Sequence, residues 1–355
     1  MDESRREYLK MGMGAVAAGL VGTASQHSQG EPNMTQPILK LPSLADQDAL
    51  RIATFSNLDG SKTRIGVIAQ NNTLIDVEAL ASQLKVKLPF DSSSMLSFLH
   101  AGEPAMHSLH QLIKNTVKGS ALLELSQVRL MSPIPKPQAN IYCVGWNYLD
   151  HFDEGKDARA DKTTKEYPTV PVFFSKGTQT MNGPFDSIPY DGSYSSMIDW
   201  EAELAVVIGR QGRNISEADA MDYVFGYAAF NDTTARDVQQ KRHSGQWFKG
   251  KSLDGHGPMG PWIVTKNGVN LDETRIICRV NGVEKQNASY QQMYFKIPVI
   301  ISELSRGLTL LPGDIIATGT PSGVGYSRKP PEFLKPGDVM ETEVSTVGVI
   351  RNTMA

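Results

Sequence analysis

The chain has 355 residues, of which 40% are hydrophobic and 21% are charged, as in a globular protein large enough to bury a sizeable core. Lys and Arg total 35 and Asp and Glu total 38, and this net charge of −3 argues against a nucleic-acid-binding surface or a polybasic membrane patch. Cys143 and Cys278 are the two cysteines of the sequence. Two cysteines so far apart exclude a thiolate zinc cluster and a multi-disulfide scaffold.

The first residues are predicted to be an export signal. SRREYLK, residues 4–10, precedes a Gly/Ala-rich apolar run at 11–23 that is too short and too glycine-rich to span a membrane. The string resembles the bacterial twin-arginine signal, with Tyr8 where Phe is usual. We therefore expect a signal peptide at 1–25, a linker at 26–48 and a periplasmic protein. A basic start on a disordered tail is the alternative, and it would leave the protein in the cytoplasm.

Residues 49–131 are predicted to form a small α+β module. RIATF, RIGVIAQ and TLIDVEAL are short strand-like segments separated by turns at Asp59-Gly60 and Asn71-Asn72. Leucines at helical spacing follow between residues 95 and 125. The proline-rich step SPIPKP, residues 132–137, is the predicted boundary with a larger domain at 132–355.

The larger domain is predicted to be rich in strands, with a few helices. Its strand-like segments are NIYCVG, VPVFFSK, ELAVVIG, PWIVT, IICRVNG, DIIATG and DVMETEVSTVGVI. Asn281-Gly282 predicts a hairpin turn, and Pro-Gly-Asp turns at 312–314 and 336–338 each precede a strand. The pattern indicates an α+β fold class.

Carboxylates give the first indication of chemistry. In DWEAELAVVI, strand periodicity places Glu201 and Glu203 on one face, about 7 Å apart at their Cα atoms. Two such carboxylates repel each other unless a cation lies between them. Asp232, the predicted N-cap of a helix, would add a third oxygen ligand, and an all-oxygen set selects Mg²⁺, Mn²⁺ or Ca²⁺ over zinc. The alternative is a solvated strand face beside an ordinary helix cap.

Two further motifs have both a functional and a structural interpretation. On a helix, His151 and Glu154 share a face, so the carboxylate can orient the imidazole as a general base, although a surface pair would look the same. The glycine string at 319–325 lacks the Gly-Lys-Ser/Thr ending of a phosphate loop. It instead predicts a tight turn that presents backbone N–H groups and the Thr320 hydroxyl.

Taken together, these segments resemble the fumarylacetoacetate hydrolase superfamily. The matching stretches are YCVGWNYLDHFDE, PVFFSKGTQTMNGP, DWEAELAVVIGR, FGYAAFNDTTARDVQ, KGKSLDGHGPMGPWIV, VNGVEKQ, LLPGDIIATGTPSGVG and LKPGDVMETEVSTVGVIRN. The resemblance implies a mixed β-roll fold preceded by the small α+β module, a homodimer, and one divalent metal ion per active site. It also implies a substrate that is a small β-diketo or 2-oxo acid.

The resemblance also implies roles for individual residues. The implied metal ligands are Glu201, Glu203 and Asp232, and the implied metal is Mg²⁺, Mn²⁺ or Ca²⁺. The implied catalytic residues are His151 and Glu154, which match an H-x-x-E dyad that activates water, and Lys251, Arg236 and Gln239, which would bind substrate carboxylate or steady an oxyanion. The implied substrate-binding residues are Lys176, Tyr148, Gly319 and Thr320.

The sequence also departs from the family pattern. Gly255 and His256 follow Asp254 where a hydroxyl near the lysine is usual, and the charged segment 155–170 after the dyad is long. A lid of different size would change the choice of substrate.

The leading hypothesis is a divalent-metal-dependent hydrolase that cleaves a C–C bond in a small acylpyruvate or β-diketo acid. Its enzymatic alternatives on the same scaffold are an oxaloacetate-type decarboxylase, a hydroxymuconate-type isomerase and a keto-sugar-acid dehydratase. The non-enzymatic alternative is a periplasmic binding protein with a structural Ca²⁺. The expected partners are a small keto acid and a second copy of the chain, with no nucleic acid and no membrane after signal removal.

Overall fold

The structure, a computed structural model, describes residues 41–69, 72–114, 119–156 and 166–355. The predicted signal peptide at 1–25 lies outside the described residues, as do most of the predicted linker and the middle of the long segment after the dyad. Among the helices that the structure describes, none has both the length and the apolar character that crossing a membrane requires.

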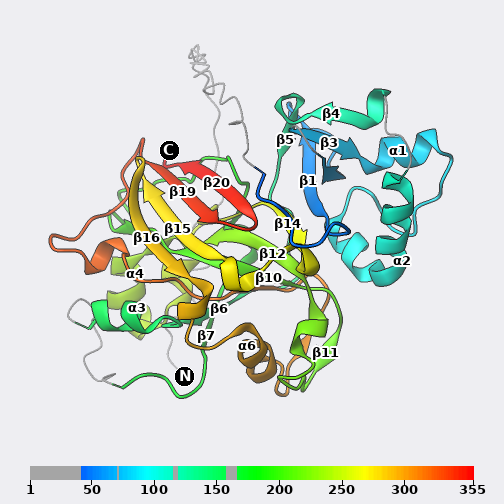
Figure 1. The fold of residues 1–355 in the computed structure, drawn as a ribbon. Coiled ribbons are helices and arrows are strands. Elements are labelled where there is room, and N and C mark those ends of the chain that lie inside the picture. Colours follow the sequence, from blue (N-terminus) through cyan, green and yellow to red (C-terminus); the bar gives the residue numbers. More distant parts are fainter. Residues whose placement is uncertain (1–40, 70–71, 115–118, 157–165) are drawn as a thin grey trace, which may run out of the picture. The chain divides into compact units, whose positions relative to one another are not determined.

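A mixed twelve-stranded sheet organises the described part of the chain (Figure 1). Its path begins with β4 (Leu122–Glu124), β3 (Thr73–Asp76), β2 (Arg64–Ile68), β1 (Arg51–Asn57) and β14 (Gly257–Thr265). It continues with β12 (Val224–Asn231), β10 (Ala202–Ile208), β18 (Ile315–Ala317), β6 (Ile141–Gly145) and β7 (Val172–Lys176). Two short strands lie off this path, β5 (Val128–Leu130) beside β1 and β8 (Met181–Asn182) beside β14.

The N-terminal elements extend this sheet across the predicted domain boundary. Antiparallel pairing of Arg51 with Val264 and of Ile52 with Ile263 joins β1 to β14. Helices α1 (Val77–Gln83) and α2 (Met95–Ile113) turn apolar side chains into a core that they share with the strands. The predicted helical stretch 95–125 is wrong at its end, because Leu122–Glu124 forms β4 and satisfies its backbone by pairing with β3.

A second, four-stranded antiparallel sheet packs on the middle of the first. It contains β16 (Val283–Ser289), β15 (Arg275–Val280), β19 (Val339–Val344) and β20 (Gly348–Thr353), and it contacts β10, β12 and β14 (Figure 1). The predicted hairpin turn joins β15 to β16, with positive φ angles of 52° at Asn281 and 76° at Gly282 that suit a primed turn. The strand predictions for this region are therefore confirmed, and the fold is the expected α+β arrangement.

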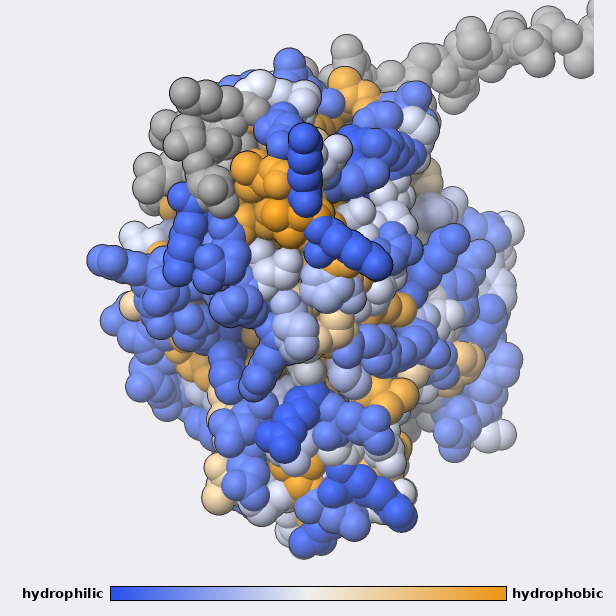
Figure 2. Space-filling model, turned by 90° about the vertical axis from the view of Figure 1, so that its right-hand side faces the viewer, coloured by the Kyte–Doolittle hydropathy of each residue, from blue (hydrophilic) through white to orange (hydrophobic). Residues whose placement is uncertain are grey.

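Short elements complete the part of the fold that surrounds the site. They are α3 (Leu149–Glu154), β9 (Ile198–Asp199), β13 (Thr234–Ala235), α4 (Arg236–Lys241) and α5 (Phe248–Lys251). The remaining elements are β11 (Gly212–Arg213), α6 (Ile297–Leu304) and β17 (Thr309–Leu310). On the side of the molecule that bears β4, α1 and α2, hydrophilic side chains predominate and apolar ones form small groups (Figure 2).

Strand β10 is the element that positions the candidate site. All seven of its residues are buried, because it lies between β12 and β18 and under the second sheet. Ala202 at its start pairs with Asn231 at the end of β12, and the backbone N–H of Asp232 donates to the carbonyl of Glu201 at 2.8 Å. This register brings Glu201 and Asp232 together although they are 31 positions apart.

Candidate active site

Three buried carboxylates converge where β10 begins and β12 ends. Glu201, Glu203 and Asp232 each offer an oxygen, and these oxygens all lie within 4.8 Å of one another. The side chains of these residues are almost fully buried, with Asp232 at 0% exposure. The alternative of a solvated strand face is therefore wrong.

Asp232 reaches the cluster by a different route from the predicted one. Helix α4 begins at Arg236 and its N-cap residue is Ala235, so Asp232 is not a helix cap. The chain leaves β12, pairs briefly as β13 with β9, and only then becomes helical. Its carboxylate is therefore held by the sheet end and by side chains, which leaves the helix terminus without a role in placing it.

Three buried cationic side chains contact the carboxylates. Lys251 Nζ lies 2.5 Å from Glu201 Oε2 and 2.7 Å from Asp232 Oδ2. Lys176 Nζ lies 2.8 Å from Asp232 Oδ1, and Arg236 Nη2 lies 2.6 Å from Glu201 Oε1. Each of the three cations has 4% side-chain exposure or less, so its charge is balanced by these contacts and only weakly by water.

The three acids differ in how well their charge is compensated. Burial raises the pKa of Glu203 well above its usual range, and the nearby Asp232 and Glu201 raise it further, while Lys251 and the Gly319 N–H at 2.8 Å only partly offset this. Burial acts in the same direction on Glu201, but Lys251 and Arg236 outweigh it and lower the pKa of Glu201 to about 2. Of the three carboxylates, Glu203 is therefore the one whose negative charge is least compensated by nearby positive charges.

The donor set fits a divalent cation. Among the described residues, four buried carboxylates of this region face three buried cations: Asp199, Glu201, Glu203 and Asp232 against Lys176, Arg236 and Lys251. Carboxylate oxygens are the ligands preferred by Mg²⁺, Mn²⁺ and Ca²⁺. Glu201, Glu203 and Asp232 are thus the residues that would hold such an ion, and the added charge would relieve the excess of acids.

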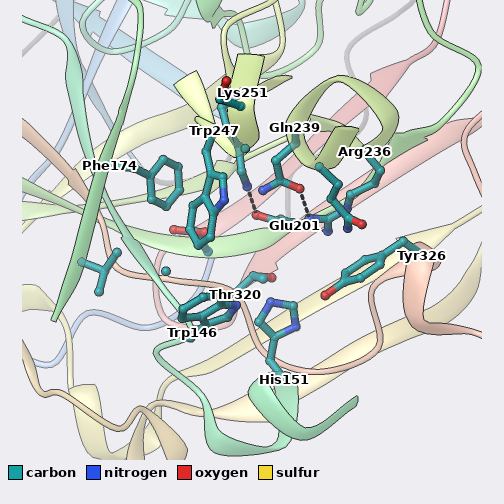
Figure 3. A pocket seen from close by; sticks show the side chains of 16 residues that line it. Trp146, His151, Phe174, Glu201, Arg236, Gln239, Trp247, Lys251, Thr320 and Tyr326 are labelled. Carbon is teal, nitrogen blue, oxygen red and sulfur yellow. Dashed lines mark hydrogen bonds and ion pairs between the residues drawn. The ribbon is translucent and has the colours of Figure 1, made fainter. Parts of the chain in front are cut away.

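The cluster opens into a cavity of about 310 Å³ (Figure 3). Glu201, Glu203, Arg236 and Lys251 line it together with His151 from helix α3. In Figure 3, Arg236 and Gln239 lie on one side of this space and the rings of Phe174 and Trp247 lie on the other. A small acid could therefore contact the charged cluster and still have room beyond it.

The predicted dyad is formed and lies at the cavity. His151 and Glu154 both belong to α3, and His151 Nδ1 lies 2.8 Å from Glu154 Oε1. Glu154 also accepts a hydrogen bond from the backbone N–H of Gly323 at 2.9 Å, which fixes its carboxylate. In the neutral imidazole, with Glu154 accepting from Nδ1–H, the Nε2 atom of His151 is left as a proton acceptor.

The glycine string at 319–325 presents backbone N–H groups, as predicted, but to carboxylates of the protein. Gly319 N–H donates to Glu203, Gly323 N–H to Glu154 and Gly325 N–H to Asp199, at distances of 2.7 to 2.9 Å. Gly319 has a φ of +102°, and a Cβ there would lie 2.7 Å from Asn147 Cβ. The string therefore orients three acids of the site at once.

The structure does not bring every predicted site residue to the cavity wall. Those that line the cavity are Glu201, Glu203, Arg236, Gln239, Lys251, His151 and Thr320. Asp232, Lys176, Glu154 and Gly319 lie behind them and contact the lining residues or one another. Tyr148 is 2% exposed and is not part of the lining, and Thr320 Oγ1 is already engaged with the carbonyl of Ala202 and the amide of Gln286.

Sequence reasoning missed Asp199 as a positioning residue. Its carboxylate accepts from Arg236 Nε at 2.8 Å and from the backbone N–H groups of Gly325 and Tyr326. It therefore links the guanidinium to the turn whose Tyr326 ring lies 4.2 Å from Arg236 Cζ. The sequence did contain a sign of this role, since Asp199 is the first acid of DWEAE, residues 199–203, which also contains Glu201 and Glu203. Trp146, Phe174 and Trp247 were also missed, because they come from three separate segments.

Comparisons with known proteins found a matching family and similar relatives. Residues 140–355 match the family described as fumarylacetoacetate (FAA) hydrolase C-terminal. The oxaloacetate tautomerase YisK of Bacillus subtilis (strain 168) is 41% identical over 295 residues, which cover 81% of this chain and 95% of the relative. The mitochondrial oxaloacetate tautomerase fahd2 of Xenopus laevis is 39% identical over 306 residues, which cover 86% and 90%.

Solved structures agree with these matches. A fumarylacetoacetate hydrolase from the psychrophilic Exiguobacterium antarcticum superimposes with a TM-score of 0.68 at 34% sequence identity, covering 86% of this chain and 99% of that one. The matched family covers more than half of the chain, including every carboxylate and cation of the site. The chain therefore belongs to the fumarylacetoacetate hydrolase family.

Proposed function

We propose that this protein catalyses keto–enol tautomerisation of oxaloacetate or a closely related 2-oxo acid, with Mg²⁺ or Mn²⁺ as its metal ion. The observation that carries the proposal is the buried cluster of Glu201, Glu203 and Asp232 at one cavity with Arg236 and Lys251. This combination suits an anionic substrate whose carbonyl must be polarised. Two relatives about 40% identical over most of the chain are named oxaloacetate tautomerases, which supports the choice of reaction.

The side chains of this protein have defined tasks in that reaction. Tautomerisation breaks a C3–H bond, moves its electron pair into a C2–C3 double bond and places a proton on the C2 oxygen. His151 Nε2 is the base that takes the C3 proton, with Glu154 orienting the ring. A divalent cation at the three carboxylates would polarise the 2-oxo group and stabilise charge on its oxygen.

Arg236 is suited to hold a substrate carboxylate. Its Nε donates to Asp199 and its Nη1 donates to Gln239 Oε1 at 3.1 Å, so the plane of the guanidinium is fixed on two sides. Its Nη2 also lies 2.6 Å from Glu201 Oε1. A guanidinium has five N–H donors, so these three contacts leave two N–H groups for a carboxylate in the cavity. Gln239 thus acts through Arg236.

The proposal is tested by following oxaloacetate with wild-type protein by proton NMR in D₂O. We expect the metal-loaded protein to accelerate exchange of the C3 protons and to interconvert keto and enol forms, without net production of pyruvate. Net pyruvate and carbon dioxide from oxaloacetate would instead identify a decarboxylase. Exchange no faster than in buffer with the same metal would overturn the proposal.

The dyad makes a separate prediction. His151→Ala is expected to lower kcat by about 10²–10⁴-fold, the usual contribution of a general base. Glu154→Gln is expected to cost less, because it removes an orienting charge and keeps the base. Steady-state kinetics of both variants on the same substrate check this. If His151→Ala keeps wild-type turnover, the pair is only a structural contact of helix α3.

Hydrolysis of a C–C bond in an acylpyruvate is the second candidate. The same dyad favours it, since His151 could take a proton from water as the oxygen adds to the acyl carbonyl. The C–C bond would then break, releasing a carboxylic acid and the enolate of pyruvate, which takes up the proton held by His151 at its C3 carbon. Acetylpyruvate distinguishes the two candidates, because a hydrolase yields acetate and pyruvate while a tautomerase leaves the carbon chain intact.

A further inference from the structure

Three aromatic side chains form a continuous wall on the side of the cavity that faces away from Arg236. Phe174 on β7, Trp146 at the end of β6 and Trp247 before α5 all line the cavity, and Figure 3 shows them on the side away from Arg236. The ring centroids of Phe174 and Trp247 are 5.2 Å apart, and those of Trp247 and Trp146 are 5.1 Å apart. The rings meet edge to face, so part of their apolar surface is left for a ligand.

The wall begins where the charged cluster ends. Lys251 Nζ, which contacts two of the three carboxylates, lies 5.1 Å from the centre of the Phe174 ring. A carbon atom next to a polarised 2-oxo group would therefore lie between the charged cluster and the rings. Its substituent would be directed along an apolar surface, which suits an apolar substituent.

Two features of the backbone hold this wall in place. Trp146 has a positive φ of 54°, a conformation that is strained for a bulky residue and tends to occur at functional sites. Next to it, Gly145 provides space for the neighbouring ring, because a Cβ there would lie 2.6 Å from Trp247 Cζ3. Both features position the two indoles against each other.

We infer that the enzyme accepts 2-oxo acids that bear an aromatic group on C3, in addition to the four-carbon diacid. The inference rests on the proposed function, since it names the class of substrate for the same reaction. The cavity volume of about 310 Å³ falls within the range of about 300–1,000 Å³ found for sites that hold larger organic ligands. In the reaction, the C3 proton leaves, the C2–C3 double bond forms in conjugation with the ring, and the C2 oxygen is protonated.

Phenylpyruvate is the probe, and oxaloacetate is measured beside it. With wild-type protein, we expect faster keto–enol conversion of both compounds than in buffer with the same metal. Trp247→Leu should lower kcat/KM for both compounds unequally. The decrease for phenylpyruvate should be about 10- to 200-fold larger than the decrease for oxaloacetate, the range that apolar pocket contacts supply. Phe248→Ala, at the exposed neighbouring aromatic, is the matched control and should leave both values unchanged.

The two assays separate failure of this inference from failure of the proposed function. Oxaloacetate conversion without any conversion of phenylpyruvate would overturn this inference and leave the proposed function standing. If neither compound is converted, the proposed function fails. Calorimetry would then test whether the wall binds an aromatic group. Weaker binding of phenylpyruvate to Trp247→Leu than to wild type would support this, and equal or absent binding would overturn it. A melting temperature for each variant identifies any that is misfolded, and Trp247→Phe then replaces it.

Discussion

Glu203→Gln is expected to abolish turnover and to weaken divalent-cation binding by more than about 100-fold. This exceeds the usual loss of affinity when a residue that only hydrogen-bonds to a metal ligand is mutated. Glu203 has 1% exposure, and its described hydrogen-bond partner is the Gly319 N–H. An amide of the same shape keeps this bond but lacks the charge that attracts a cation. Isothermal calorimetry with Mn²⁺, together with kinetics, measures both effects.

The fold of this variant should survive. Burial together with Asp232 and Glu201 disfavours the charged form of Glu203, so removing that charge relieves repulsion in the metal-free protein. We therefore expect the metal-free variant to melt at the same temperature as wild type or higher. Glu103→Gln, on the exposed surface of α2, is the matched control. Wild-type Mn²⁺ affinity in Glu203→Gln would show that the cluster is not the metal site.

Lys251→Met is expected to remove turnover and to lower the free energy of unfolding by about 3–5 kcal/mol, the usual cost of breaking a buried ion pair by deleting one partner. The methionine fills a similar volume but leaves Glu201 and Asp232 without the ammonium that contacts both. Denaturant unfolding measures the loss. A divalent cation should restore more stability to this variant than it adds to wild type, because it supplies the missing charge.

The neighbouring lysine offers a control in the same helix. Lys249 is exposed on α5, and Lys249→Met should change stability little, as expected for a surface charge. If Lys251→Met unfolds at the same denaturant concentration as wild type, the contacts of Lys251 with the two carboxylates do not hold the cluster together.

Local patterns predicted much of this fold. The apolar run after Glu203 predicted β10, and Asn281-Gly282 predicted the hairpin, because strand burial and positive φ angles leave direct traces in the sequence. Helix spacing similarly predicted that His151 and Glu154 would meet. These are contacts between residues no more than a few positions apart.

Contacts between distant segments were harder to predict. Asp232 was expected to join the carboxylates from a helix cap, and only the register of β10 against β12 shows that the end of a strand brings it to Glu201. The pairing of β1 with β14, across the proline-rich step, likewise has no local signal. The aromatic wall combines residues from the end of β6 onward, from β7 and from the segment before α5, namely Trp146, Phe174 and Trp247, so no single stretch of sequence contains it.

The most direct test of the account is the metal dependence of C3 proton exchange in oxaloacetate, measured by NMR on one preparation before chelation, after chelation and after Mn²⁺ is restored. We predict that exchange falls to the rate in buffer after chelation and recovers with Mn²⁺, while Glu203→Gln stays at the buffer rate throughout. Exchange that persists undiminished in the chelated wild-type protein and in Glu203→Gln would contradict a metal-dependent tautomerase built on Glu201, Glu203 and Asp232.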